Sequence, residues 1–126
     1  MTRKELITKV KKRKEALGIT IENLSLLSGV SVRTVNRFLG GEDVKLSTLE
    51  RITHLLGLDF SGNETISLQE LKRRRASEKA LFMASLVQGN SSLEMQGMER
   101  ESLEKMISEF EEAFLNGEYK ERLWVA

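Results

Sequence analysis

The sequence predicts an all-α protein. Proline is absent from the 126 residues, and alternating β-branched runs typical of strands are hard to find. Apolar residues instead recur three and four positions apart, which is the spacing of one face of a helix. Glycines and small capping residues separate these segments. We therefore expect a bundle of short helices followed by a helical C-terminal extension.

Composition limits the classes of function. Apolar residues make up 40% of the chain, which is enough for a core. The absence of cysteine excludes a disulfide framework, a thiolate zinc site and a cysteine nucleophile. His54 is the only histidine, so no metal cluster is predicted and a structural role in its helix is expected. The sequence contains no Walker loop or nucleophile elbow and gives no support to an enzyme or a cofactor.

The charge is unevenly distributed. Residues 1–60 carry 11 Lys or Arg against 7 Asp or Glu, whereas residues 81–126 carry 4 against 9. This asymmetry suggests nucleic acid as a partner at the front and a different partner at the back. The amino terminus has no apolar core and no run approaches 18 apolar residues, so neither a signal peptide nor a membrane span is predicted. A cytoplasmic location is expected.

Four helices are predicted in the first half. The first covers 3–17, has an apolar stripe that includes Val10, and ends at Gly18. The next two cover 21–28 and 32–39, and the fourth begins at Ser47. The expected N-cap residues are Thr20, Ser31 and Ser47, the last with Glu50 in a capping box.

A linker-like segment, 59–65, separates the halves and suggests domains at 1–62 and 63–126. Ser67 with Glu70 predicts the start of a long helix that reaches Gln88 and breaks at Gly89-Asn90. Within it, residues 80–87 (ALFMASLV) are apolar on nearly all sides and are therefore expected to be buried. A short turn is predicted at 92–96, capped by Ser91.

The last predicted helix covers 99–115. Its buried stripe is expected to contain Leu103, Met106, Ile107, Phe110 and Phe114, with glutamates mostly on the other face. Trp124 follows in the tail, and two interpretations are open. Its indole folds back onto the domain, or it anchors another chain, since tryptophan is enriched at binding hot spots.

Residues 20–39 meet the steric requirements of a helix-turn-helix. The two helices cross closely, so the first needs a small residue at the contact, and Ser25 provides it. Gly29 permits the turn at positive φ. Leu24, Val30 and Val35 are placed to pack inward and fix the crossing angle. The second helix can then lie in the major groove, which is about 12 Å wide.

This pattern resembles the lambda-repressor-like, or Cro-type, helix-turn-helix family of bacterial and phage transcriptional regulators. The resemblance covers roughly residues 3–60. It is carried by Thr20, Leu24-Ser25, Ser28-Gly29-Val30-Ser31, Thr34-Val35, Asn36, Arg37, Gly40-Gly41-Glu42 and the Leu49–Gly57 helix. One departure is Ile21, where family members often have a glutamine that donates to a phosphate.

The resemblance implies roles for individual residues. Base contacts are expected from Val32, Arg33, Asn36 and Arg37, because arginine pairs with guanine, asparagine with adenine, and valine packs on a thymine methyl. The side chain of Thr34 and the backbone near Gly41 are expected at phosphates. Lys45 and lysines of the first helix, Lys12 among them, would add attraction without sequence information.

Two functions of different classes are compatible with these features. The first is a homodimeric, sequence-specific repressor of transcription that inserts helix 32–39 into the major groove and dimerises through its C-terminal half. The alternative is an antitoxin whose acidic C-terminal half neutralises a toxin. A pure protein adaptor is a third possibility. The basic runs 11–14 and 72–75 fit either a solvated helix face or a phosphate contact.

Overall fold

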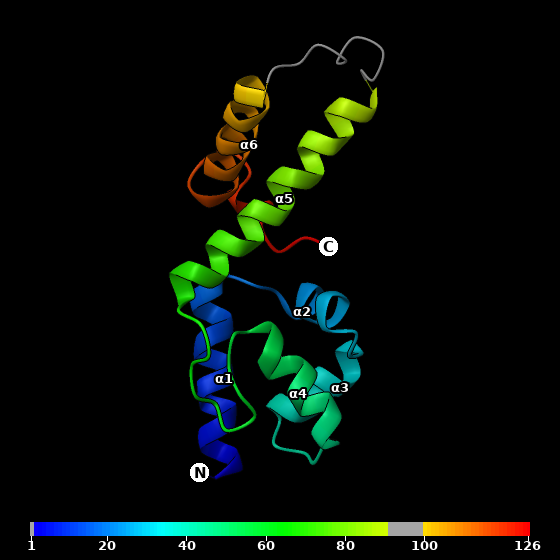
Figure 1. Ribbon diagram of the computed structural model, residues 1–126. Coiled ribbons are helices and arrows are strands. Elements are labelled where there is room, and N and C mark those ends of the chain that lie inside the picture. Colours follow the sequence, from blue (N-terminus) through cyan, green and yellow to red (C-terminus); the bar gives the residue numbers. More distant parts are fainter. Residues whose placement is uncertain (1, 91–99) are drawn as a thin grey trace. The chain divides into compact units, whose positions relative to one another are not determined.

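The computed structural model describes residues 2–90 and 100–126. The helices are α1 (Arg3–Leu17), α2 (Ile21–Ser28), α3 (Val32–Leu39), α4 (Leu46–Leu55), α5 (Leu68–Asn90), α6 (Arg100–Leu115) and the short 3-10 helix η2 (Lys120–Arg122) (Figure 1). Outside these helices, a single β-bridge joins Leu58 and Glu64 in the described part of the chain. The predicted all-α class is confirmed. The predicted turn 92–96, with Ser91, lies outside the described residues.

The chain divides into two compact units. The first comprises residues up to Leu71 together with Trp124–Ala126, and the second comprises Lys72–Leu123. The carboxyl-terminal tail thus belongs to the first unit, although it follows the second in sequence. Among the described residues, no helix is long and apolar enough to cross a membrane.

Helix α1 follows the predicted pattern with one exception. Thr2 caps it by accepting from the Glu5 N–H at 3.2 Å, and Gly18 ends it at φ 74°. The apolar stripe is buried as expected, with Val10 fully inaccessible. Arg13 belongs to the basic run 11–14, for which a solvated helix face or a phosphate contact was expected. Its side chain is only 7% exposed. That part of the prediction for residues 11–14 is wrong.

Arg13 is buried because its guanidinium finds partners in the chain after α4. Its Nε donates to the Leu56 carbonyl at 2.9 Å, Nη2 donates to the Ile66 carbonyl at 2.5 Å, and Nη1 pairs with the Glu64 carboxylate. The expected linker 59–65 is therefore fastened along α1, where its trace runs in Figure 1. The division into a DNA-binding domain at 1–62 and a C-terminal region at 63–126 stays a prediction.

Helix α4 begins two residues earlier than predicted, because its N-cap is Lys45 and not Ser47. Lys45 is the N-cap, in extended backbone, and its carbonyl accepts from the Leu49 N–H at 3.0 Å. No side-chain cap is made, and Ser47 lies inside the first turn. An N-cap side chain works from a non-helical residue, so the predicted capping box with Glu50 does not form. His54 is exposed on this helix.

Helix α5 starts as predicted but differs further along. The Ser67 Oγ accepts from the Glu70 N–H at 3.1 Å, and the helix ends at Asn90, two residues beyond the predicted last residue Gln88. Ala80 and Ala84 are buried and Met83 and Val87 are half-buried, whereas the other three large side chains of 80–87 are exposed. The exposed fractions are 54% for Leu81, 60% for Phe82 and 45% for Leu86. Burial of the whole segment was therefore a wrong expectation.

Helix α6 and the tail complete the chain. Phe114 is buried, and its ring lies 5.4 Å from that of Tyr119, while the rest of the predicted stripe is half-buried. The first of the two interpretations of Trp124 holds. Its indole is 6% exposed, and Nε1 donates to the Leu17 carbonyl at 2.9 Å.

Candidate DNA-binding interface

The α2–turn–α3 segment is built by local hydrogen bonds. Thr20 accepts from the Asn23 N–H at 3.1 Å, and Ser31 accepts from the Thr34 N–H at 3.1 Å. Between them Gly29 adopts φ 74°, a left-handed conformation that favours glycine. Each helix therefore begins and ends at a residue that its own sequence specifies.

The packing that fixes the two helices is also as expected. Leu24 and Val35 are fully buried, Val30 is 5% exposed, and the small Ser25 is half-buried. Because protein interiors are close-packed, the fully buried side chains of Leu24 and Val35 leave little freedom for the angle at which α2 and α3 cross. The position of α3 is therefore set by its inward face.

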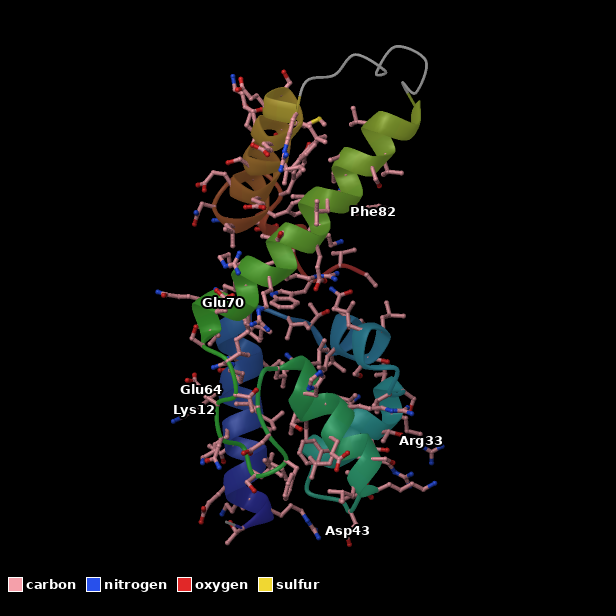
Figure 2. All side chains as sticks on the ribbon, in the orientation of Figure 1. Lys12, Arg33, Asp43, Glu64, Glu70 and Phe82 are labelled. Atoms are coloured by element: carbon pink, nitrogen blue, oxygen red, sulfur yellow. The ribbon has the colours of Figure 1, made fainter. Side chains whose placement is uncertain are left out.

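The outward face of α3 carries the predicted base-contacting residues. Arg33, Asn36 and Arg37 are exposed, and Val32 is 39% exposed. Val35 and Phe38, on the opposite face, are buried. Arg33 makes no hydrogen bond or ion pair within the described residues and projects from the unit (Figure 2). The structure thus places all four predicted base-contacting residues on the outward, exposed face of α3.

The carboxyl end of α3 closes in a Schellman motif. Gly41 has φ 94°, its N–H donates to the Phe38 carbonyl at 3.0 Å, and the Glu42 N–H donates to the Arg37 carbonyl at 3.0 Å. These two bonds satisfy helix-terminal carbonyls that otherwise lack partners. The Gly41 N–H is consequently engaged within the chain, which argues against the predicted backbone contact from that group to a phosphate.

Two acidic residues of the α3–α4 loop pair with arginines. The Arg37 Nε lies 3.2 Å from the Glu42 Oε2. The next residue, Asp43, pairs with Arg3, whose Nη1 also donates to the Gly41 carbonyl at 3.0 Å. The sequence prediction did not assign functions to Glu42, Asp43 or Arg3. The glycine pair that ends α3 was the available signal, because a glycine at 41 turns the next residue back toward Arg37.

The predicted phosphate-contacting residues do not all lie together. Thr34 is half-buried beside Ser31, which donates to its Oγ1 at 2.9 Å and so leaves the Thr34 hydroxyl proton available. Lys45 is exposed at the start of α4. Lys12 and Arg33, by contrast, project from opposite sides of the first unit (Figure 2). Ile21, which replaces a donor in the resemblance, is half-buried at the start of α2.

Comparison with known protein families agrees with this geometry. Residues 10–63 match the family model described as Helix-turn-helix, and this match supports the predicted resemblance of that segment to the Cro/C1, lambda-repressor-like type. No curated protein and no solved structure gives a significant match to the chain. The fold and the family model together support a DNA-binding regulator of transcription.

Proposed function

We propose that this protein is a dimeric repressor that binds double-stranded DNA in a sequence-specific manner and inserts α3 into the major groove. The observation that carries the proposal is that α3 has one buried face and one exposed face. Val35 and Phe38 anchor one face in the core, and Arg33, Asn36 and Arg37 are exposed on the other. Such a helix can enter the groove without disturbing the packing that holds it.

The chemistry of the exposed residues supports direct reading of bases. Arg33 and Arg37 can each donate two hydrogen bonds to guanine O6 and N7, and Asn36 can pair with adenine. Val32 supplies apolar contact for a thymine methyl at the start of the helix. One good bidentate pair discriminates between bases by about 1–3 kcal/mol, so two arginines can define a site.

Phosphate contacts are proposed for Thr34, which lies in the first turn of α3, and for Lys45, the N-cap of α4. These contacts position the protein without carrying sequence information. Gly41 is a weaker candidate because its N–H is engaged, and Lys12 is a weaker candidate because it projects away from Arg33.

Dimerisation is proposed through the exposed apolar face of α5, formed by Leu81, Phe82 and Leu86. Phe82 projects from the side of α5 away from α6 (Figure 2). The second unit buries few large side chains in its described part, so a second copy would supply the core that two helices alone lack. A two-fold dimer would also read two half-sites roughly 34–36 Å apart.

Repression requires only that the dimer occupy a DNA site that overlaps a promoter. The alternative function, an antitoxin, would use the same exposed face of α5 for a toxin. The oligomeric state of the free chain distinguishes the two assignments of this face.

Selection from random-sequence duplex DNA at near-physiological salt tests the proposal. We expect a palindromic motif with half-sites one helical turn apart. The Arg33→Ala variant should lose preference at one base pair of each half-site, by about tenfold. Lys12→Ala, which removes the same charge on the other side of the unit, should leave the base preferences of the motif unchanged. Failure of the unmodified protein to enrich any motif would contradict the proposal.

A further inference from the structure

We propose that Glu42 is a positioning residue that makes Arg37 selective for guanine. The inference rests on the proposed function and assigns part of its base specificity to a residue outside α3. Glu42 itself carries the same charge as the DNA backbone and contacts no base in this proposal. It acts through the guanidinium of Arg37.

The connection between the two residues is double. The Glu42 N–H donates to the Arg37 carbonyl at 3.0 Å, and the Glu42 Oε2 lies 3.2 Å from the Arg37 Nε. The first bond exists because Gly41, at φ 94°, turns the chain back onto the last turn of α3. The backbone of Glu42 is thus fixed relative to the side chain that its carboxylate holds.

Glu42 lies at one edge of the Arg37 guanidinium, and its position there determines which N–H donors remain available to DNA. Arginine has five N–H donors in a planar fork, one on Nε and two on each Nη. With the Glu42 carboxylate paired as an ion pair at Nε, the two Nη atoms form the end of the fork that faces away from it. That end matches two adjacent acceptors such as guanine O6 and N7. Without Glu42, the Nε and one Nη of Arg37 can also bind an acceptor together along the side edge of the guanidinium. The side chain can also adopt other rotamers, in which it reaches a phosphate.

The charge of Glu42 acts in the same direction. Arg37 and Glu42 are 53% and 60% exposed, so both meet solvent and approaching phosphates. Glu42 offsets the positive charge of Arg37 and thereby reduces its general attraction to the backbone, which is the term that carries no sequence information. The pair therefore favours a bound state in which the free end of Arg37 meets a base.

The neighbouring Asp43 provides a matched control. It carries the same charge one residue later, and its partner is Arg3 of α1 rather than a residue of α3. Replacing Asp43 by Asn alters the net charge of the loop as much as replacing Glu42 by Gln. Any effect common to the two variants is general electrostatics, and an effect of Glu42→Gln alone is positioning.

The experiment is parallel selection from a random-sequence duplex library with the full-length chain. The proteins compared are the unmodified chain, Arg37→Ala, Glu42→Gln, Asp43→Asn and the double variant Arg37→Ala/Glu42→Gln. Arg37→Ala identifies the base pair that Arg37 reads. At that base pair we expect Glu42→Gln to lower the preference for guanine about fivefold, the size expected when one side chain loses its fixed rotamer. Preferences at other base pairs and those of Asp43→Asn should stay unchanged.

The outcomes separate this inference from the proposed function. In the Arg37→Ala background, Glu42→Gln should have no further effect on base preference. If Arg37→Ala alters one base pair and Glu42→Gln does not, Glu42 has no positioning role although the proposed function stands. An equal loss of preference at every base pair in Glu42→Gln would also overturn the inference. A failure of the unmodified chain to enrich any motif overturns both proposals.

Discussion

The indole Nε1 of Trp124 donates to the carbonyl oxygen of Leu17 at 2.9 Å, joining residues 107 positions apart in the chain. Leu17 is the last residue of α1, where carbonyls lack partners within the helix. The tail after η2 thus supplies a donor to the helix-turn-helix unit. As a result, residues 72–123 lie in sequence between two segments that both belong to the first unit.

Trp124 should therefore contribute to the stability of the DNA-binding unit. Trp124→Ala removes a 6% exposed side chain, and we expect it to lower the free energy of unfolding by about 3–5 kcal/mol. Trp124→Phe keeps most of the apolar contact and should cost less, about 1–3 kcal/mol for the unpaired Leu17 carbonyl and lost volume. Urea denaturation followed by circular dichroism measures both. A loss below 1 kcal/mol for the alanine variant would argue against this contact.

Arg13 and Glu64 should differ strongly in their effects although they form one ion pair. Arg13→Met leaves the carbonyls of Leu56 and Ile66 without their donor, and we expect a loss of about 2–4 kcal/mol in the free energy of unfolding. Glu64 is 61% exposed, so Glu64→Gln should cost no more than about 1 kcal/mol. Denaturation midpoints compare the two variants, with the exposed Lys12→Ala as a control. Equal losses would mean that the ion pair, not the carbonyl contacts, is the source of stability.

Gly41 should be sensitive to substitution for a conformational reason. An added Cβ would meet no atom within 4 Å, but φ is 94°, where side chains are disfavoured. Gly41→Ala is therefore expected to cost about 1–2 kcal/mol. Gly40→Ala is the matched control, because Gly40 lies at φ −82°, and its effect should be smaller. Thermal unfolding of both variants tests this, and the reverse order would contradict the backbone argument.

Asp59 should make stability depend on pH in the acid range. The backbone N–H of Asn63 is the main cause that lowers the pKa of its carboxyl group. The Ser61 N–H adds to the lowering, and desolvation opposes it. Because the pKa is lower in the folded state, the contribution is present above the unfolded value of about 3.9 and is lost as the pH falls through the folded value.

The Asp59→Asn variant isolates that contribution. The difference in free energy of unfolding between the unmodified chain and this variant should shrink as the pH falls from 6 to 3. Denaturation curves at the two pH values measure it. A difference that is constant or grows toward acid would exclude the stabilising role of the ionised carboxylate.

Phe82 should control the oligomeric state. Phe82→Glu places a charge in the proposed dimer face, so we expect a dimer to dissociate to monomer at micromolar concentration. Phe60→Glu is the matched control, since Phe60 is 58% exposed in the first unit and Phe82 60% in the second. Analytical ultracentrifugation measures the masses. An unmodified chain that is monomeric at every concentration would refute the dimer and favour a different protein on this face.

Helix bounds and the exposed face of α3 could be predicted from sequence because their causes are local. Thr20 and Ser31 act on N–H groups three residues away, and Gly29 sets its own φ. The spacing of Val35 and Phe38 fixes which side of α3 faces inward. Ser47 was the exception, because sequence alone could not show that the chain already turns into the helix at Lys45.

Burial and pairing over long separations were decided by tertiary structure. In the sequence, Arg13 is not distinguished from its basic neighbours. It is distinguished only in the folded chain, where its Nε donates to the carbonyl of Leu56, 43 residues away. Glu42 becomes a partner of Arg37 only once the loop is folded.

The sequence by itself determined the helical class, the helix-turn-helix and the residues that α3 exposes, since capping, turn formation and apolar spacing act within a few residues. Only the tertiary structure decided that segment 59–65 lies fastened on α1, that Trp124 packs with Leu17, and that Phe82 stays exposed. The physical reason is that burial depends on which distant groups come together, and a local pattern shows a side chain's character but not its partner.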